Sequence, residues 1–201
     1  MQAHCPHCSP DAPALAHLLE ETPHFRVVCD AHPITEGHLL IIPKKHISCI
    51  GACDGETFQE FRGLYNQWSE RIRTIYGTVH SFEHGVIGQT VFHAHVHLLP
   101  YAGTPGSIVP EGRAHFTKMR DLSELRQRFA QDGHYLFFSI GKDQWFVDTS
   151  LGVPRFFRDR FALALGRPER GNWKIMHENK KLMVKAEREI QQAKDLLLKA
   201  V

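Results

Sequence analysis

Three histidines recur at every second position in the stretch VFHAHVHLLP, as His93, His95 and His97. Side chains of a β-strand alternate between its two faces, so a strand over 90–99 would place all three imidazoles on one face. Neutral imidazoles at neutral pH serve as nucleophiles, general bases or metal ligands. The alternative is a half-buried strand whose imidazoles bond only to backbone groups or water. The residues between them would face a core: Phe92, Ala94, Val96 and Leu98.

A second reactive motif is the Cys-Pro-His-Cys stretch at Cys5–Cys8. Its Cys-x-x-Cys spacing lets one turn offer two thiolates to a tetrahedral metal, although redox and structural pairs share that spacing. The chain has an odd number of cysteines, which argues against a disulfide framework in a reducing compartment. The other three are interpreted as small buried residues: Cys29, Cys49 and Cys53.

The elements that must position these groups are short strands around one helix. β-rich runs predict strands over 25–29, 38–42 and 78–85, besides the one over 90–99. Apolar residues at steps of three and four predict a helix over 56–76, with Asp54 as its N-cap and Gly77 as its stop. A run of strands with one inserted helix indicates an α+β sheet with helices on one side.

The segment YAGTPGSIVPEG holds three glycines and two prolines and is the best boundary in the sequence. We predict domains over 1–103 and 113–201, joined by a linker over 104–112. The C-terminal α/β extension is expected to contain a helix over 121–131, a hairpin over 134–149, a helix over 155–165 and a charged helix over 174–199.

Charge divides unevenly between the two parts. Residues 1–112 carry 6 basic and 11 acidic residues, a net −5, whereas residues 113–201 carry 18 and 11, a net +7. The basic half is interpreted either as solvated helix faces or as an arm that grips an anionic substrate or docks on the acidic half. No apolar run is long enough to span a membrane, and the N-terminus lacks the pattern of a secretory signal. A cytoplasmic location without membrane partners is therefore expected.

Three motifs follow one another along the first half of the chain: VVCDAHPITEG, GHLLIIPKKHI and GQTVFHAHVHLLP. Together they resemble the histidine-triad (HIT) family of nucleotide hydrolases and transferases, over about residues 4–101. The resemblance implies a five-stranded antiparallel sheet with a long helix, and a nucleotide as the substrate. Small HIT proteins commonly form dimers, so a homodimer is also expected.

The resemblance assigns a role to five residues. His95 would attack the α-phosphorus and form a nucleotidyl-phosphohistidine that water hydrolyses. His97 and Gln89 would stabilise the phosphate oxygens and help to protonate the leaving group. His38 would support the same pocket, and Asp30 would bind the ribose hydroxyls. Nucleotidyl-transferring branches usually carry glutamine at the third triad position, so His97 favours hydrolysis, although some phosphorylases keep the histidine.

Several HIT-like proteins complete an N-terminal cysteine pair with the histidine after Ile-Pro-Lys and with the first triad histidine. The resemblance therefore implies a closed, structural Zn²⁺ site that orients the strand carrying the nucleophile. Its ligands would be Cys5, Cys8, His46 and His93, with His4 and His7 as competitors.

Two features depart from the family pattern. The stretch Phe-Glu-His-Gly at 82–85 resembles only some branches, so His84 is either an extra polar contact or a turn residue. The segment 153–174 resembles the C-terminal segments of HIT-like domains of the CwfJ type and of diadenosine-polyphosphate phosphorylases. Three functions are thus weighed: a nucleotide hydrolase, a dinucleoside polyphosphate phosphorylase or nucleotidyltransferase, and a nucleotide- or RNA-binding module without turnover.

Overall fold

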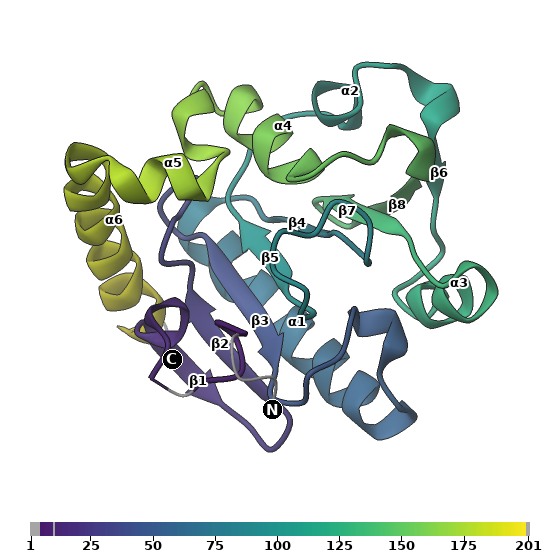
Figure 1. The fold of residues 1–201 in the computed structure, drawn as a ribbon, viewed down its shortest axis with the longest axis horizontal. Helices are drawn as coiled ribbons and strands as arrows, with labels where there is room; N and C mark the ends of the chain where they lie inside the picture. The colour runs from purple at the N-terminus through teal and green to yellow at the C-terminus, as the bar shows by residue number, and fades with distance from the viewer. Residues whose placement is uncertain (1–4, 10, 200–201) are drawn as a thin grey trace.

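The computed structural model describes residues 5–9 and 11–199, and its centre is one antiparallel sheet (Figure 1). Eight strands lie in the order β1-β2-β3-β5-β4-β7-β8-β6. The strands are β1 Leu18–Glu21, β2 Phe25–Cys29, β3 Leu39–Pro43, β4 His80–Glu83, β5 Val96–Leu99, β6 Phe116–Lys118, β7 Leu136–Ile140 and β8 Asp143–Val147. The helices are α1 Gly55–Tyr76, α2 Pro105–Ile108, α3 Glu124–Asp132, α4 Phe156–Ala164, α5 Trp173–Glu178 and α6 Lys180–Lys199. Short 3₁₀ turns are Pro13–Leu15, Ile50–Ala52, Arg113–His115, Thr149–Leu151 and Pro168–Arg170.

The α+β class is confirmed, and the first 103 residues supply five strands, β1 to β5. The C-terminal part continues the same sheet, because β7 pairs with the outer edge of β4 from His80↔Ile140 to Glu83↔Phe137. The stretch predicted as a linker is folded as well: it contains α2, and Ile108 is fully buried. One hydrogen-bonded sheet thus crosses the predicted domain boundary.

The strand predicted over 90–99 is wrong for residues 90–95, which form a loop ahead of β5. The β3–β5 ladder begins at Ile41↔Val96, and β3 ends two residues later at Pro43, which has no N–H to continue it. The amide of Ala94 instead donates to Ile47 O at 2.8 Å. His93 and His95 therefore project from a loop, and only His97 lies in a strand.

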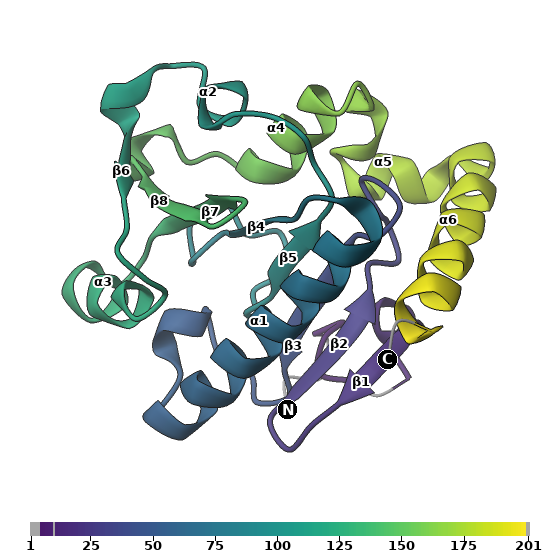
Figure 2. The same ribbon diagram turned by 180° about the vertical axis from the view of Figure 1, so that it is seen from behind.

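Alternation along β5 divides the core into two layers. Val96 and Leu98 pack against α1, which crosses one face of the sheet (Figure 2). On the opposite face His97 stacks on Phe82 with ring centroids 4.1 Å apart, and α4 covers that region through Phe157 and Phe161. The C-terminal part thus covers the face that bears the last triad histidine.

Helix boundaries follow local capping. Asp54 accepts from the Thr57 amide at 2.9 Å, and Gly77 ends α1 in the left-handed region, as predicted. The helix predicted over 174–199 is broken at Asn179, whose side chain accepts from the Leu182 amide at the start of α6. No helix in the described ranges is long and apolar enough to cross a bilayer.

Glu83 in β4 is a carboxyl group with no solvent exposure. Burial raises its pKa from 4.5 to about 7, although the Tyr135 hydroxyl and the Ile50 amide donate to it. The folded state then holds a proton that the unfolded state loses above pH 4.5, so stability falls as pH rises from 4.5 to about 7. We expect Glu83→Gln to remove up to about 3 kcal/mol of that pH dependence. Urea unfolding at pH 5 and pH 8 measures the change in the free energy of unfolding for the wild type and for Glu83→Gln. The same change in both proteins would contradict the raised pKa of Glu83.

Candidate active site and metal-binding cluster

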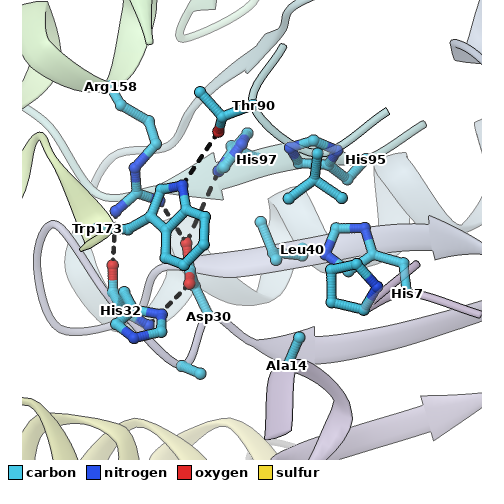
Figure 3. Close-up of a pocket in the computed structure, with 13 residues that line it drawn as sticks. His7, Ala14, Asp30, His32, Leu40, Thr90, His95, His97, Arg158 and Trp173 are labelled. Carbon is cyan, nitrogen blue, oxygen red and sulfur yellow. Dashed lines mark hydrogen bonds and ion pairs between the residues drawn. The ribbon is translucent and has the colours of Figure 1, made fainter. Parts of the chain in front are cut away.

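The site is a cavity on the face opposite α1, named here the triad cavity (Figure 3). Residues of the N-terminal part and of the α4–α5 region line it together. They include His7, Asp30, His95, His97, Arg158 and Trp173.

His95 is held in one tautomer by the loop that carries it. Its Nδ1 lies 2.6 Å from the carbonyl oxygen of His93. A carbonyl only accepts, so Nδ1 carries the proton and Nε2 keeps a free lone pair. The side chain is half-buried, and burial lowers its pKa below the ordinary value, which favours the neutral, nucleophilic form. The geometry therefore leaves Nε2 of His95 available to attack an electrophile.

A relay of hydrogen bonds sets the tautomer of His97. The Ile34 amide donates to Nδ1 of His38 at 3.0 Å, so a neutral His38 carries its proton on Nε2. Nε2 of His38 lies 2.9 Å from Nδ1 of His97 and donates to it, which leaves the proton of His97 on Nε2. Burial lowers the pKa of His38 to about 4 and that of His97 well below its usual value, so both rings are neutral.

The Nε2 of His97 is buried and has no partner among the described residues. A buried N–H without an acceptor costs free energy, so a ligand that supplies one is favoured there. Since His97 lines the cavity beside His95, with ring centroids 5.0 Å apart, its N–H suits an oxygen of a group bound at His95. His38 does not line the cavity and acts through His97.

Asp30, at the end of β2, is engaged by a residue from the far half of the chain. Its Oδ2 lies 2.7 Å from Nη1 of Arg158 in α4, and its Oδ1 accepts from the His32 amide at 2.8 Å. Burial raises the pKa of Asp30, but Arg158, His38 and the His32 amide lower it more, to about 2. Each carboxylate oxygen can accept a further bond, so the pair does not exhaust Asp30 as an acceptor.

Arg158 is itself buried and held on several sides. Its guanidinium also donates to the carbonyl oxygens of His32, Arg170 and Gly171, at 2.7, 3.3 and 3.2 Å. Four of its five N–H groups are thus engaged, which leaves one on Nη1 for a ligand. Sequence reasoning missed Arg158; the only indication was the net +7 of the C-terminal half, interpreted in part as an arm that docks on the acidic half.

Trp173, the first residue of α5, lines the cavity and links the C-terminal part to the N-terminal part. Its indole N–H donates to Thr90 Oγ1 at 3.0 Å, in the loop that leads to His95, and its ring lies 5.6 Å from that of His32 (Figure 3). The aromatic wall formed by Trp173 and His32 was not predicted. It offers a flat apolar surface suited to stacking.

Two predicted residues lie away from the cavity wall. Gln89 is buried, and its amide donates to the carbonyl of Ser48 at 2.7 Å rather than pointing at His95. His84 accepts from the amide of Phe157 at 3.0 Å and so satisfies one of the free N–H groups at the start of α4. His84 follows β4 outside any strand and is bonded to the extension, a role that differs from the ligand contact and the plain turn residue considered from the sequence.

The four predicted metal ligands do come together. Their donor atoms all lie within 4.8 Å of one another. Nδ1 of His93 is 3.4 Å from the sulfurs of Cys5 and Cys8, and Nδ1 of His46 is 3.3 Å from Cys8 Sγ. Tetrahedral zinc would place such atoms roughly 3.3 to 3.8 Å apart. The cluster is therefore a Cys₂His₂ group that could hold a metal.

The orientation of His93 supports that fit. Its Nε2 donates to Pro43 O at 2.7 Å, which keeps the lone pair of Nδ1 directed at the two sulfurs. His7, named as a competing ligand, is not part of the cluster and lines the triad cavity instead. His4, the other competitor, lies outside the described residues.

Comparison with known proteins identifies one family, and each match covers only part of this chain and part of the relative. Residues 13–103 match the HIT domain family model. An uncharacterized HIT-like protein of Mycoplasma genitalium is 30% identical over 89 residues, 42% of this chain and 63% of that protein. The nitrilase and fragile histidine triad fusion protein of Caenorhabditis elegans is 32% identical over 88 residues, 42% of this chain and 20% of that protein. The chain thus spans less than two thirds of either relative.

Among solved structures, a hypothetical histidine triad nucleotide-binding protein from Sulfolobus tokodaii is 29% identical, with a TM-score of 0.43. The match covers 50% of this chain and 71% of that one.

Proposed function

We propose that the protein is a hydrolase that cleaves a nucleotide at its α-phosphate and releases a nucleoside monophosphate, a proposal that the match of residues 13–103 to the HIT domain family supports. The observation that carries the proposal is the pair of fixed tautomers, with a free lone pair on His95 Nε2 beside a free N–H on His97 Nε2. The bond cleaved would be a phosphoanhydride or a phosphoramidate, as in a dinucleoside polyphosphate or a nucleoside phosphoramidate.

The reaction would take two displacements. In the first, Nε2 of His95 attacks the α-phosphorus and the bond to the leaving group breaks; the leaving group takes the bonding electron pair and, where it is an amine, a proton from solvent. In the second, water attacks the phosphorus and loses a proton to solvent, the P–N bond breaks with its electron pair returning to Nε2 of His95, and the monophosphate departs. His97 and the remaining N–H of Arg158 are suited to stabilise the charge that develops on the phosphate oxygens.

The walls of the triad cavity suit the rest of a nucleotide. Asp30 retains acceptor capacity for the ribose hydroxyls, which is the role that the resemblance implies. Trp173 and His32 offer a stacking surface for a base. Gln89 stays a proposed contact to the phosphate and would have to leave Ser48 to reach it.

A substrate panel tests the proposal. The protein is incubated with adenosine phosphoramidate, diadenosine polyphosphates, nucleotide sugars and capped RNA, each with and without inorganic phosphate, and the products are separated. Release of a nucleoside monophosphate that does not depend on phosphate supports hydrolysis. Formation of a nucleoside diphosphate only when phosphate is present would indicate the phosphorylase instead. Tight binding without any product would indicate a binding module.

We propose that the Cys₂His₂ cluster holds a structural Zn²⁺, because its four donors form a closed set with no position for a substrate. One equivalent of zinc is expected by elemental analysis, and the Cys5→Ser/Cys8→Ser double variant is expected to lose it together with several kcal/mol of stability. Cys29→Ser is the matched control, because Cys29 is buried outside the cluster. Zinc retained by the double variant would refute the site.

The predicted homodimer is constrained by the sheet. Both edges of β4 are paired within the chain, to β5 on one side and to β7 on the other. The outermost strands are β1 and β6, so a second chain would have to pair through another surface than the β4 edge.

A further inference from the structure

The turn at Cys5–Cys8 presents side chains to two sites. Cys5 and Cys8 point at the metal-binding cluster, whereas His7 between them lines the triad cavity. The His7 ring lies 5.0 Å from the ring of His95 and 5.5 Å from that of His93, edge-on to both. Figure 3 shows it across the cavity from Arg158 and Trp173.

His7 is buried yet lacks any hydrogen-bond partner within residues 5–9 and 11–199. Only 4% of its surface is exposed, and its Nδ1 is fully enclosed without a partner. Burying an imidazole this way costs free energy, whereas a phenyl ring of similar size would fill the space without that cost. Pro6, Ala14 and Leu40, which line the cavity together with it, offer its ring no side-chain hydrogen-bonding group. An unsatisfied polar ring on an apolar wall indicates a ligand that supplies the missing bond.

The position of His7 identifies the part of the ligand that it would meet. A phosphate held at His95 has several acceptor oxygens, and His97 and Arg158 line a different side of the cavity from His7 (Figure 3). The His7 ring lies on the other side of His95, with its centroid 5.0 Å from that of the His95 ring. Its N–H can therefore meet an oxygen that the other donors leave free.

We propose that His7 is a substrate-binding residue that hydrogen-bonds the phosphate of a nucleotide bound at His95, carried there by the metal-binding turn. The inference rests on the proposed function, since it presumes a nucleotide at His95. It gives the cluster a second role: because Cys5 and Cys8 flank His7, the ring is in place only when both cysteines are held at the cluster. Metal removal is then expected to weaken phosphate binding as well as the fold.

The test compares two probes that differ only in phosphate. Adenosine and adenosine 5′-monophosphate are titrated calorimetrically into the wild type, His7→Phe and His7→Gln. His7→Phe keeps the size of the ring and removes both nitrogens, and His7→Gln restores a polar group. We expect His7→Phe to weaken binding of the monophosphate about tenfold, with adenosine affinity unchanged and partial recovery in His7→Gln. The metal content and melting temperature of each variant show whether the turn at Cys5–Cys8 keeps its structure.

The control is His134→Phe, because His134 also has a buried, unpartnered Nδ1 but lines a separate surface pocket. Equal weakening of both probes in His7→Phe would show that the ring only packs, and no change in either would show that it is not a contact; both overturn the inference. If His7→Phe loses its metal, the ratio of the affinities of His7→Gln for the monophosphate and for adenosine decides whether His7 contacts the phosphate. A wild type that binds neither probe would instead count against the proposed function.

Discussion

Replacing His95 by alanine is expected to lower turnover roughly 10³-fold or more, because nucleophile removal abolishes the covalent route. Nε2 of His95 has a free lone pair at the triad cavity, because the His93 carbonyl fixes the proton of the ring on the opposite nitrogen. His97 cannot substitute, because its Nδ1 accepts from His38 and its Nε2 carries the proton.

The measurements for His95→Ala are steady-state turnover, affinity for the monophosphate product, and mass spectrometry of the protein quenched during turnover. The wild type is expected to carry an acid-labile nucleotide adduct that the variant lacks, whereas product affinity and melting temperature stay within a few-fold and a few degrees. His115→Ala serves as the control, since His115 lies beside Asp148 on the surface far from the cavity. Full activity of His95→Ala would exclude the mechanism.

Replacing Arg158 by methionine is expected to lower the free energy of unfolding by about 3–5 kcal/mol, the cost of leaving one member of a buried ion pair without its partner. Asp30 and Arg158 have side-chain exposures of only 8% and 7%, so water does not replace the lost contact. The double variant Asp30→Asn/Arg158→Met is expected to recover much of the loss, because it removes the stranded charge.

Urea unfolding measures both variants, and Arg160→Met is the matched control. Arg160 lies on the same helix and pairs with Glu111, but that pair is more exposed, so its loss is expected to cost about 1 kcal/mol or less. The Asp30 pair also has a pH signature: the pKa of Asp30 is depressed, so its contribution is present above pH 3.8 and is lost as pH falls towards 2. Equal stability losses in Arg158→Met and Arg160→Met would contradict the buried pair.

The parts of the site that the sequence predicted depend on short-range patterns. The Cys-x-x-Cys spacing lets one turn offer two sulfurs to the same point, so a shared site for Cys5 and Cys8 could be predicted from four residues. The meeting of His46 and His93 with them followed from the family motifs, and the structure places the four donor atoms together. The caps of α1 were equally local, since Asp54 and Gly77 act on their own turn.

The parts that were missed depend on contacts between distant segments. Arg158 reaches Asp30 across 128 positions of sequence, and Trp173 reaches Thr90 across 83. No local pattern distinguishes an arginine that will be buried from one that stays on a helix surface. The loop at 90–95 was predicted as a strand because histidines and apolar residues alternate there. Its backbone instead bonds to the Ile47 carbonyl through the Ala94 amide and does not pair with β3. β1 was missed because its sequence, Leu-Leu-Glu-Glu, has no alternation and no β-branched or aromatic residue. β6 was missed because it has only three residues.

Because β7 pairs with β4, the C-terminal residues that line the cavity belong to the same folded sheet as the loop that carries His95. If the residues that complete an active site come from a separate protein, the fraction of complete sites depends on the concentration of both proteins and falls on dilution. Here Arg158 and Trp173 arrive by folding of the same chain, at a local concentration that the tether fixes. The specific activity in the proposed hydrolysis should therefore not fall on dilution, as it would if Arg158 and Trp173 came from a separate protein.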